Sequence, residues 1–502
     1  MQGKKTYTPK LMYQVHLNSL VPQDNFYRKL DKVLDMGFLY KDTAPYYGIE
    51  GQESIDPVVF FKICLVGYLN NINSDRKLIE YCSNCLDVRL FIRYDIDESL
   101  PWHSTISRTR QLYGEDVFLD LFKKVLGLCV QKGMVRGKRQ AIDSAFVKAN
   151  ASLDSVVEKE ILEDVKAYCD ELNEGSEYKV PTSEQEGKEE KEGSKRVPTL
   201  NSTHYSPTDP DARISVKPGK APHLNFFGQI AVDDSHHVIT GAMADFADKG
   251  DSQCLPGILG QTIENLKGNE ILIDQIVADT GYSSVDALRF CQQNHIDAYI
   301  PNTGRYKPTR EGFEYDQGND RYLCTKGNKA ILLFKTITAD KNGHLRKEYR
   351  SSTANCISCT LKSVCIGKNS TKKITDVVGK SYYDQMHEKM QTRYAKKLSK
   401  IRKSTVEPVL GTLINFMNMK RVNSRGIEQA SKHVIMAALC YNLKKYMKFV
   451  QRVVKTKAME QSIFVANGFN QLGKYLCTEL RSILAWCGSE KSINGQLRVS
   501  QQ

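Results

Sequence analysis

Five short segments rich in β-branched, aromatic and other apolar residues lie between residues 135 and 302. They read RQAIDSAFVKAN, HLNFFGQIAVD, HHVITGAMADF, ILIDQIVADT and IDAYIPN. Apolar residues at helical spacing occur just before the fourth segment, in DSQCLPGILGQTIENLKG, and just after it, in SVDALRFCQQNH. Three strands followed by a helix, a strand, a helix and a strand predict a mixed α/β sheet.

Two of these segments carry an acid at a position where a carboxylate needs an explanation. Asp143 lies in the middle of the first segment, where a buried charge without a partner or a cation is costly. Asp279 ends the fourth segment and precedes Thr280 and Gly281, an arrangement that also serves simply to close a strand. The first and fourth strands of such a sheet are often neighbours, so we expect the two carboxylates side by side. Two negative charges at such a short distance are tolerated when a divalent cation lies between them.

A third acid, Glu407, lies in the segment STVEPVLGTLINFMN. Thr405 is predicted to cap a helix there and to place Glu407 in its first turn. Val406, Leu410 and Leu413 give this helix an apolar face that can press against the sheet. The alternative explanation of Glu407 is a favourable charge at a helix N-terminus.

Two other glutamates in the same basic part of the chain compete with Glu407 for this role. Glu388 lies in the polar stretch DQMHEKMQTRYAKK, which has no apolar block to anchor it, so its carboxylate is expected in solvent. Glu428 begins a segment with a long apolar face, and a position in the first helical turn explains its charge.

The charge of the chain is distributed unevenly around a net value of +13. Residues 154–196 hold 14 acids and 7 bases, whereas residues 368–457 hold 21 Lys or Arg and 5 acids. A dense basic region favours a polyanionic partner, most commonly nucleic acid, although a merely soluble basic surface is the alternative. The acidic run between the first two strands, residues 154–205, is predicted to be an insertion whose second half is disordered.

The first 130 residues are predicted to be helical. Ser104 is expected to cap a helix that carries Arg108 and Arg110, after two short helices, an order that resembles a helix-turn-helix reader of DNA. A plain helical bundle with surface arginines explains the same spacing. No apolar stretch reaches the length of a membrane span and the first residues lack an export signal, so we expect a cytoplasmic protein without a membrane partner.

Cysteines in such a chain are expected to be reduced thiols or metal ligands. Cys82 and Cys85 lie in an apolar helical segment without a second pair and are predicted to be core residues. Four other cysteines have the spacing of a tetrahedral, structural zinc site: Cys324, Cys356, Cys359 and Cys365. Four reduced thiols are the alternative.

Several of these blocks, in this order, resemble the bacterial insertion-sequence DDE transposases, in particular the insertion-sequence 1182 type. SIDPVVFFKICLVGYL and LPWHSTISRTRQ are similar to the N-terminal domain of that family, and AIDSAFVKANAS to its first catalytic strand. SPTDPDAR resembles the segment that enters the sheet, and VADTGYSS the second catalytic block. VEPVLG, followed by RG and ALCYNLKKY, resembles the catalytic helix and the helix after it.

The resemblance implies that Asp143, Asp279 and Glu407 form a carboxylate triad on a ribonuclease-H-like α/β fold. It implies a DNA transposase that holds two Mg²⁺ ions, or Mn²⁺, cuts the ends of a mobile element and joins the 3′-OH ends to target DNA. It also implies a homodimer or higher oligomer on DNA, in a bacterial cytoplasm near the nucleoid. A non-catalytic zinc-containing DNA-binding regulator, or a metal-dependent nuclease without strand transfer, remains the alternative.

The implied organisation has four parts. These are a helical DNA-binding domain (1–130), the catalytic domain (135–304 and 390–457), a small cysteine-rich, zinc-ribbon-like insertion (305–389) and a helical tail (458–502). Ile414 stands where relatives commonly have a DNA-contacting lysine, so Lys420, Arg421 or Arg425 is expected to replace it. The full set of predicted DNA contacts is Arg108, Arg110, Arg402, Lys403, Lys420, Arg421, Arg425, Lys444 and Lys445.

Overall fold

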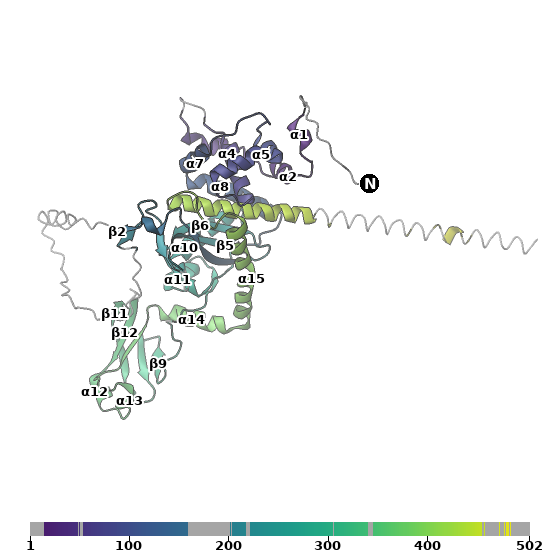
Figure 1. Cartoon of the computed structure of the whole chain (residues 1–502). Helices are drawn as coiled ribbons and strands as arrows, with labels where there is room; N and C mark the ends of the chain where they lie inside the picture. The colour runs from purple at the N-terminus through teal and green to yellow at the C-terminus, as the bar shows by residue number, and fades with distance from the viewer. Residues whose placement is uncertain are drawn as a thin grey trace, which may run out of the picture. The chain divides into compact units, whose positions relative to one another are not determined.

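A computed structural model describes residues 15–48, 50, 54–158, 201, 203–216, 221–304, 306–339 and 345–453, with residues 456, 471, 476, 478–480 and 482 beyond them (Figure 1). The chain divides into two compact units, Met1–Asn442 and Leu443–Gln502. The predicted disorder in the acidic run and most of the predicted tail lie outside the described residues. None of the helices in the described ranges is long and apolar enough to cross a membrane.

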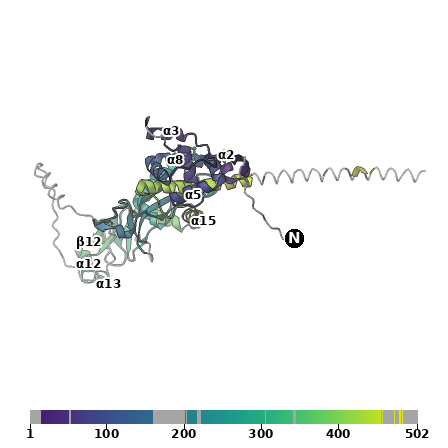
Figure 2. The ribbon, with the colours of Figure 1, turned by 45° about the horizontal axis from the view of Figure 1, so that its top comes forward.

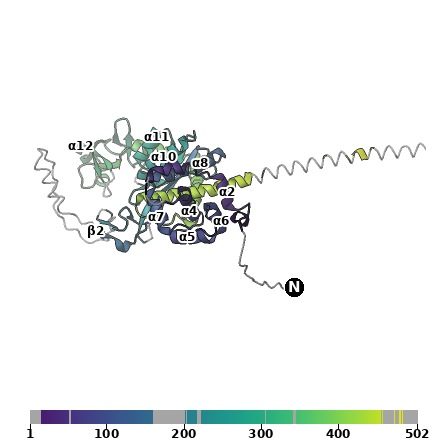
Figure 3. The ribbon, with the colours of Figure 1, turned by 90° about the horizontal axis from the view of Figure 1, so that it is seen from above.

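The N-terminal region is helical, as predicted, and its helices cluster together in each view (Figures 2 and 3). α4 begins at Pro57 because the carboxylate of Asp56 accepts hydrogen bonds from the amides of Val58 and Val59. The rings of Phe61 and Tyr113 stack in the core of this helical region, with their centroids 6.0 Å apart. The elements are α1 (Leu17–Leu20), α2 (Phe26–Val33), α3 (Leu39–Thr43), η1 (Ala44–Tyr46), α4 (Pro57–Leu69), α5 (Asp75–Asn84), α6 (Leu86–Ile92), α7 (His103–Leu112) and α8 (Glu115–Gln131).

The predicted roles of Ser104 and Arg110 are wrong. α7 begins at His103 after Trp102, so Ser104 lies inside the helix instead of capping it. Arg110 is buried, and its guanidinium pairs with Asp75 of α5 at 2.8 Å. Arg110 therefore joins two helices of the bundle and does not face a DNA surface, whereas Arg108 is exposed.

The central sheet is mixed α/β, as predicted. Its strands are β1 (Arg139–Lys148), β4 (Arg213–Ser215), β5 (His223–Asp233), β6 (Ile239–Phe246), β7 (Gln275–Val277) and β8 (Asp297–Tyr299). β5 lies antiparallel to β1 and to β6, whereas β7 is parallel to both β1 and β8. The five predicted strands thus lie in the order third, second, first, fourth, fifth, and the first and fourth are neighbours.

Helices cover both faces of this sheet. α10 (Asp251–Lys267), α11 (Val285–Gln293) and α14 (Lys380–Gln391) share one apolar core with Ile142 and Ile276. α15 (Arg393–Phe416) packs on the other face, where Ala395 and Leu398 contact Val277. Alternate residues of β1 therefore face different helices.

A helix that begins at Ile427 connects the sheet to the N-terminal helices. Asn442 hydrogen-bonds the backbone of Ile239 in β6, through both its amide oxygen and its amide nitrogen. On the same helix, Ser431 donates to Glu115 of α8 at 2.7 Å, and His433 Nδ1 contacts the hydroxyl of Tyr68 at 2.7 Å. Burial lowers the pKa of His433 to about 4, so the ring is neutral where it packs.

The cysteine-rich region forms a sheet of its own, in the order β13, β12, β11, β10, β9 (Figure 1). Tyr322, Leu332, Tyr349 and Ile374 form its small core. Its elements are β9 (Phe313–Asp316), β10 (Arg321–Cys324), β11 (Ile331–Ala339), β12 (Leu345–Ser351), α12 (Thr353–Ile357), α13 (Lys362–Cys365) and β13 (Lys373–Val377). A separate pair, β2 (Val157–Glu158) and β3 (His204–Tyr205), joins the two ends of the acidic run after η2 (Leu153–Ser155).

The Arg110 to Asp75 pair gives a stability prediction. Arg110→Met is expected to lower the free energy of unfolding by about 3 to 5 kcal/mol, because it leaves a largely buried carboxylate without its partner. Arg108→Met, on the same helix but exposed, is the matched control. Urea unfolding followed by circular dichroism measures both. A loss below about 1 kcal/mol for Arg110→Met, the range of a surface ion pair, would contradict the burial argument.

Candidate active site

Asp143 lies within β1, and Asp279 follows the neighbouring parallel strand β7. The register of the two strands ends with Ala141 opposite Val277, and each acid lies two residues further along its own segment. Asp143 lies on the face that α15 covers, because Arg402 of that helix donates to its carboxylate. The charge of Asp279 raises the pKa of Asp143, so the two carboxylates lie within electrostatic reach of one another.

Asp279 also closes its strand in the ordinary way. Its side chain accepts a hydrogen bond from the amide of Gly281 at 2.9 Å and starts the short helical turn η4 (Thr280–Tyr282). A Cβ on Gly281 would lie 2.7 Å from Asp251 Oδ2 and 3.0 Å from Asp279 Oδ1. Glycine is needed here because two carboxylate oxygens occupy the space that a Cβ would require.

The position of Glu407 within its helix differs from the prediction. α15 begins at Arg393, with Thr392 as its N-cap, so Thr405 is a buried residue inside the helix and Glu407 is far from its first turn. Pro408 also lies inside the helix, where it is tolerated at the loss of one backbone hydrogen bond. The helix-terminus explanation of Glu407 is thereby removed.

The predicted apolar face of this helix is confirmed, because Val406, Leu410 and Leu413 are all buried. The carboxylate of Glu407 remains about half exposed, next to the covered face of the sheet. By contrast, Glu428 pairs with Lys432 at 2.8 Å in its own helix.

Glu388 is exposed, as predicted, but the reason given for it is wrong. Its helix, α14, is anchored in the core through Met386. Glu388 itself lines a different cavity, with Tyr306 and Lys380. Neither competing glutamate is placed beside Asp143.

One guanidinium connects the first and third predicted acids. Arg402 Nη1 donates to Asp143 Oδ2 at 2.8 Å, and Arg402 Nη2 lies 3.7 Å from Glu407 Oε1. The Arg402 side chain is only 10% exposed, so the pair with Asp143 is shielded from water. Arg402 was predicted to bind DNA phosphate, and the structure instead places it between two carboxylates.

Electrostatics explain why a cation is favourable at this position. Burial raises the pKa of Asp143, and the negative charge of Asp279 raises it further, whereas the amide of Ser144 and the Arg402 guanidinium lower it. Positive charge therefore stabilises the ionised form of Asp143. In the described structure, Arg402 supplies that charge.

The donor set suits a hard divalent cation, since carboxylate oxygens are the ligands that Mg²⁺ prefers. Within the described residues, however, no group of three or more His, Cys, Asp or Glu has the spacing of a metal site. The side chain of Arg402 lies between Asp143 and Glu407. A cation shared by these two acids requires the guanidinium to move aside.

A fourth carboxylate, which the sequence did not single out, lies close by. Asp251 is the first residue of α10, and Ser144 donates to its Oδ1 at 2.6 Å. Burial raises the pKa of Asp251, and the charge of Asp279 contributes to the rise. In the sequence, Asp251 is marked only by its position directly after Gly250 at a helix start, and the helix dipole explains an acid at that position equally well.

Exposed cations lie around the end of β1. The amide of Val422 donates to the carbonyl of Lys148 at 2.9 Å, and the amide of Lys148 donates to the carbonyl of Lys420 at 3.1 Å, so the segment after α15 extends the sheet edge. A groove of about 350 Å³ there is lined by Lys148, Arg421 and His223. Lys148 was missed by the sequence analysis. Of the predicted contacts in the first unit, those exposed to solvent are Arg108, Lys403, Lys420, Arg421 and Arg425.

Lys444 and Lys445 belong to the second compact unit, where both lie on a helix and are partly buried. Burial lowers the pKa of Lys445, and the nearby charges of Arg452 and Lys448 lower it further. A phosphate would relieve this repulsion.

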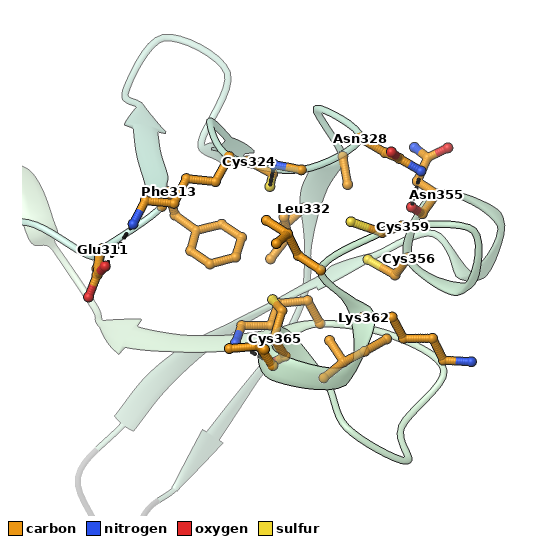
Figure 4. A pocket seen from close by; sticks show the side chains of 18 residues that line it. Glu311, Phe313, Cys324, Asn328, Leu332, Asn355, Cys356, Cys359, Lys362 and Cys365 are labelled. Atoms are coloured by element: carbon orange, nitrogen blue, oxygen red, sulfur yellow. Dashed lines mark hydrogen bonds and ion pairs between the residues drawn. The ribbon is translucent and has the colours of Figure 1, made fainter.

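The four predicted zinc ligands line one cavity of about 390 Å³, with Leu332 and Ile366 among its apolar walls (Figure 4). Cys356 is buried and its sulfur contacts the hydroxyl of Ser351 at 2.9 Å. The sulfur of Cys324 accepts from the amide of Gly327 at 3.4 Å. The sulfurs thus surround a common space, but among the described side chains they do not converge at metal-ligand spacing.

Comparison with known families identifies two transposase domains in the chain. Residues 3–112 match a family model described as a transposase domain, DUF772, and residues 323–447 match one described as a transposase DDE domain. The second match contains Glu407 and the four cysteines, whereas Asp143 and Asp279 lie outside both matches.

No curated protein matches the chain. Among solved structures, a cryo-EM structure of the piggyBac transposase synaptic complex with hairpin DNA aligns with 85% of this chain and 83% of that chain. The identity is 11% and the TM-score 0.25, a similarity that carries no argument about the fold or the function of this chain.

The position of Arg402 predicts competition with a divalent cation. Arg402→Gln is expected to bind Mn²⁺ at least about fivefold more tightly in the absence of DNA, because it removes a positive charge that occupies the carboxylates. Lys403→Gln, which removes an exposed neighbouring charge, is the control. Calorimetric titration with Mn²⁺ measures both affinities. Equal affinities for Arg402→Gln and the unmodified protein would show that the guanidinium does not occupy the cation site.

Proposed function

We propose that the protein is a DNA transposase of the insertion-sequence 1182 type, with Asp143, Asp279 and Glu407 as its catalytic carboxylates. The two transposase domain matches support the general class. The strand order third, second, first, fourth, fifth, with the last two parallel to the first, supports a ribonuclease-H-like core.

A single observation carries the assignment of the site. The charge of Asp279 acts on Asp143, and the Arg402 guanidinium that pairs with Asp143 lies 3.7 Å from Glu407 of α15. These contacts link three acids from segments far apart in the sequence. A protein that only binds DNA gains nothing from an anionic cluster facing phosphate, whereas a metal-dependent enzyme requires one.

Two Mg²⁺ ions, or Mn²⁺, would supply the chemistry by activating a water for phosphodiester cleavage and then the 3′-OH for attack on target DNA. Asp143, Asp279 and Glu407 would hold these ions. Once displaced from Asp143, Arg402 can donate its hydrogen bonds to a DNA phosphate. No side chain needs to form a covalent bond to DNA.

The exposed cations around β1 and α15 would hold the DNA backbone. Lys148 and Arg421 line the groove at the strand end, and Lys403, Lys420 and Arg425 are further exposed cations. Such contacts are independent of sequence, so binding should weaken as salt increases. Two element ends call for two active sites, which favours a homodimer or a higher oligomer on DNA.

Replacing any one of the three proposed ligands should abolish strand cleavage. Asp143→Asn, Asp279→Asn and Glu407→Gln are each expected to fold and to bind element-end DNA, because only the metal-bound state requires the charge. Cleavage of a labelled end substrate in Mg²⁺ is the measurement, with a gel-shift assay for binding. Glu388→Gln and Glu428→Gln are matched controls that should retain activity.

The outcomes separate the alternatives. Robust cleavage by Glu407→Gln, with loss in one of the controls, would reassign the third ligand. Cleavage by the unmodified protein without joining of the 3′-OH ends would identify a nuclease. End binding without any cleavage in Mg²⁺ or Mn²⁺ would identify a regulator.

We further propose a structural zinc ion in the cysteine-lined cavity, bound by Cys324, Cys356, Cys359 and Cys365. Protein purified without chelators is expected to contain about one Zn²⁺ per chain and to lose thermal stability when the metal is removed. Cys356→Ser should reproduce that loss, whereas Cys85→Ser, a cysteine outside the cavity, should not. Metal-free protein with unchanged stability in Cys356→Ser would exclude the zinc site.

A further inference from the structure

Asp251 and Asp143 lie on opposite faces of β1. Ser144, the residue after Asp143, faces α10 because neighbouring side chains of a strand alternate. Its hydroxyl donates to Asp251 Oδ1 at 2.6 Å. The carboxylate of Asp251 thus holds the backbone next to Asp143 from behind the sheet.

The same carboxylate supports the turn that carries Asp279. Asp251 Oδ2 approaches Gly281 so closely that a Cβ there would lie at 2.7 Å. Tyr282, fully buried in the same turn, donates its hydroxyl to Gln229 of β5 at 2.6 Å. Gln229 pairs with Ser144 in the sheet register. The turn that carries Asp279 and the strands β1 and β5 therefore meet around Asp251.

We infer that Asp251 is a positioning residue that fixes the separation of Asp143 and Asp279 from the opposite face of the sheet. One carboxylate oxygen holds the strand of Asp143 through Ser144, and the other packs against the turn of Asp279 at Gly281. This inference rests on the proposed function, because it concerns the two acids assigned as metal ligands there. It gives Asp251 no contact with DNA or with the reacting atoms.

The physical consequence is an effect on cation affinity. A divalent cation that tolerates little displacement of its ligands requires both carboxylates at fixed positions. Loss of a residue that orients such a ligand typically weakens binding of the metal ion about 10- to 100-fold. A higher metal concentration can compensate for such a loss. Removal of a ligand itself cannot be compensated in this way.

The experiment compares Asp251→Ala, Asp251→Asn and Ser144→Ala in the full chain. Mn²⁺ binding is measured by calorimetry without DNA, and Mg²⁺-dependent cleavage is measured across a range of metal concentrations. Asp286→Ala, an exposed acid in the first turn of α11, is the matched control for an acid at a helix start. Circular dichroism establishes that each variant is folded.

We expect Asp251→Ala and Ser144→Ala to weaken Mn²⁺ binding at least about tenfold and to raise the Mg²⁺ needed for half-maximal cleavage by a similar factor. Cleavage at saturating Mg²⁺ should remain. Asp251→Asn, which keeps an oxygen for Ser144 to donate to, should recover most of the affinity. Asp286→Ala should bind like the unmodified protein.

Three results would overturn the inference. Unchanged Mn²⁺ affinity in Asp251→Ala would show that the contact does not position the ligands. Loss in both Asp251 variants with no effect of Ser144→Ala would show that the charge matters instead of the hydrogen bond. Loss of cleavage in Asp251→Ala that no Mg²⁺ concentration restores would make Asp251 a ligand. Absence of Mn²⁺ binding and cleavage in the unmodified protein would instead overturn the proposed function.

Discussion

Two unit charges 4 Å apart repel by about 1 kcal/mol in water and by about 4 kcal/mol near a protein surface. The charge of Asp279, just beyond the end of β7, acts in this way on Asp143 in β1 and raises its pKa. The surroundings compensate for this repulsion, since Arg402 supplies a positive charge and the amide of Gly281 binds Asp279. The long helix α15 must cross the sheet at this point so that Arg402 and Glu407 can reach the acids. The fold thus maintains a charge imbalance that a divalent cation would relieve.

Much of this arrangement could be predicted from the sequence, because it depends on local patterns. Alternating apolar residues identify the strands, and Asp143 interrupts one of them. The order of strands and helices then makes the first and fourth strands neighbours, which brings Asp279 beside it. The apolar face of α15 likewise follows from its helical period.

The errors arose where contacts between distant segments outweigh local signals. Thr405 resembles a helix cap, but it is buried inside a longer helix that begins at Arg393. Arg110 resembles an exposed DNA contact until its partner Asp75 is placed beside it by the packing of α5 on α7. Asp251 carries no local signal for a role at the site, because its link to Ser144 exists only after the sheet has formed.

The paired strands β2 and β3 hold together the two ends of the acidic run, which lies between the first two predicted strands of the central sheet. Because the ends of the run are fixed to one another, the free energy of closing the loop depends only weakly on its length, by about 0.6 kcal/mol for each doubling. Related chains could therefore gain or lose residues between β2 and β3 with little effect on the folded core. Evolution, or an engineer inserting a domain, can change the length of the protein between these two strands without disturbing the sheet that carries Asp143.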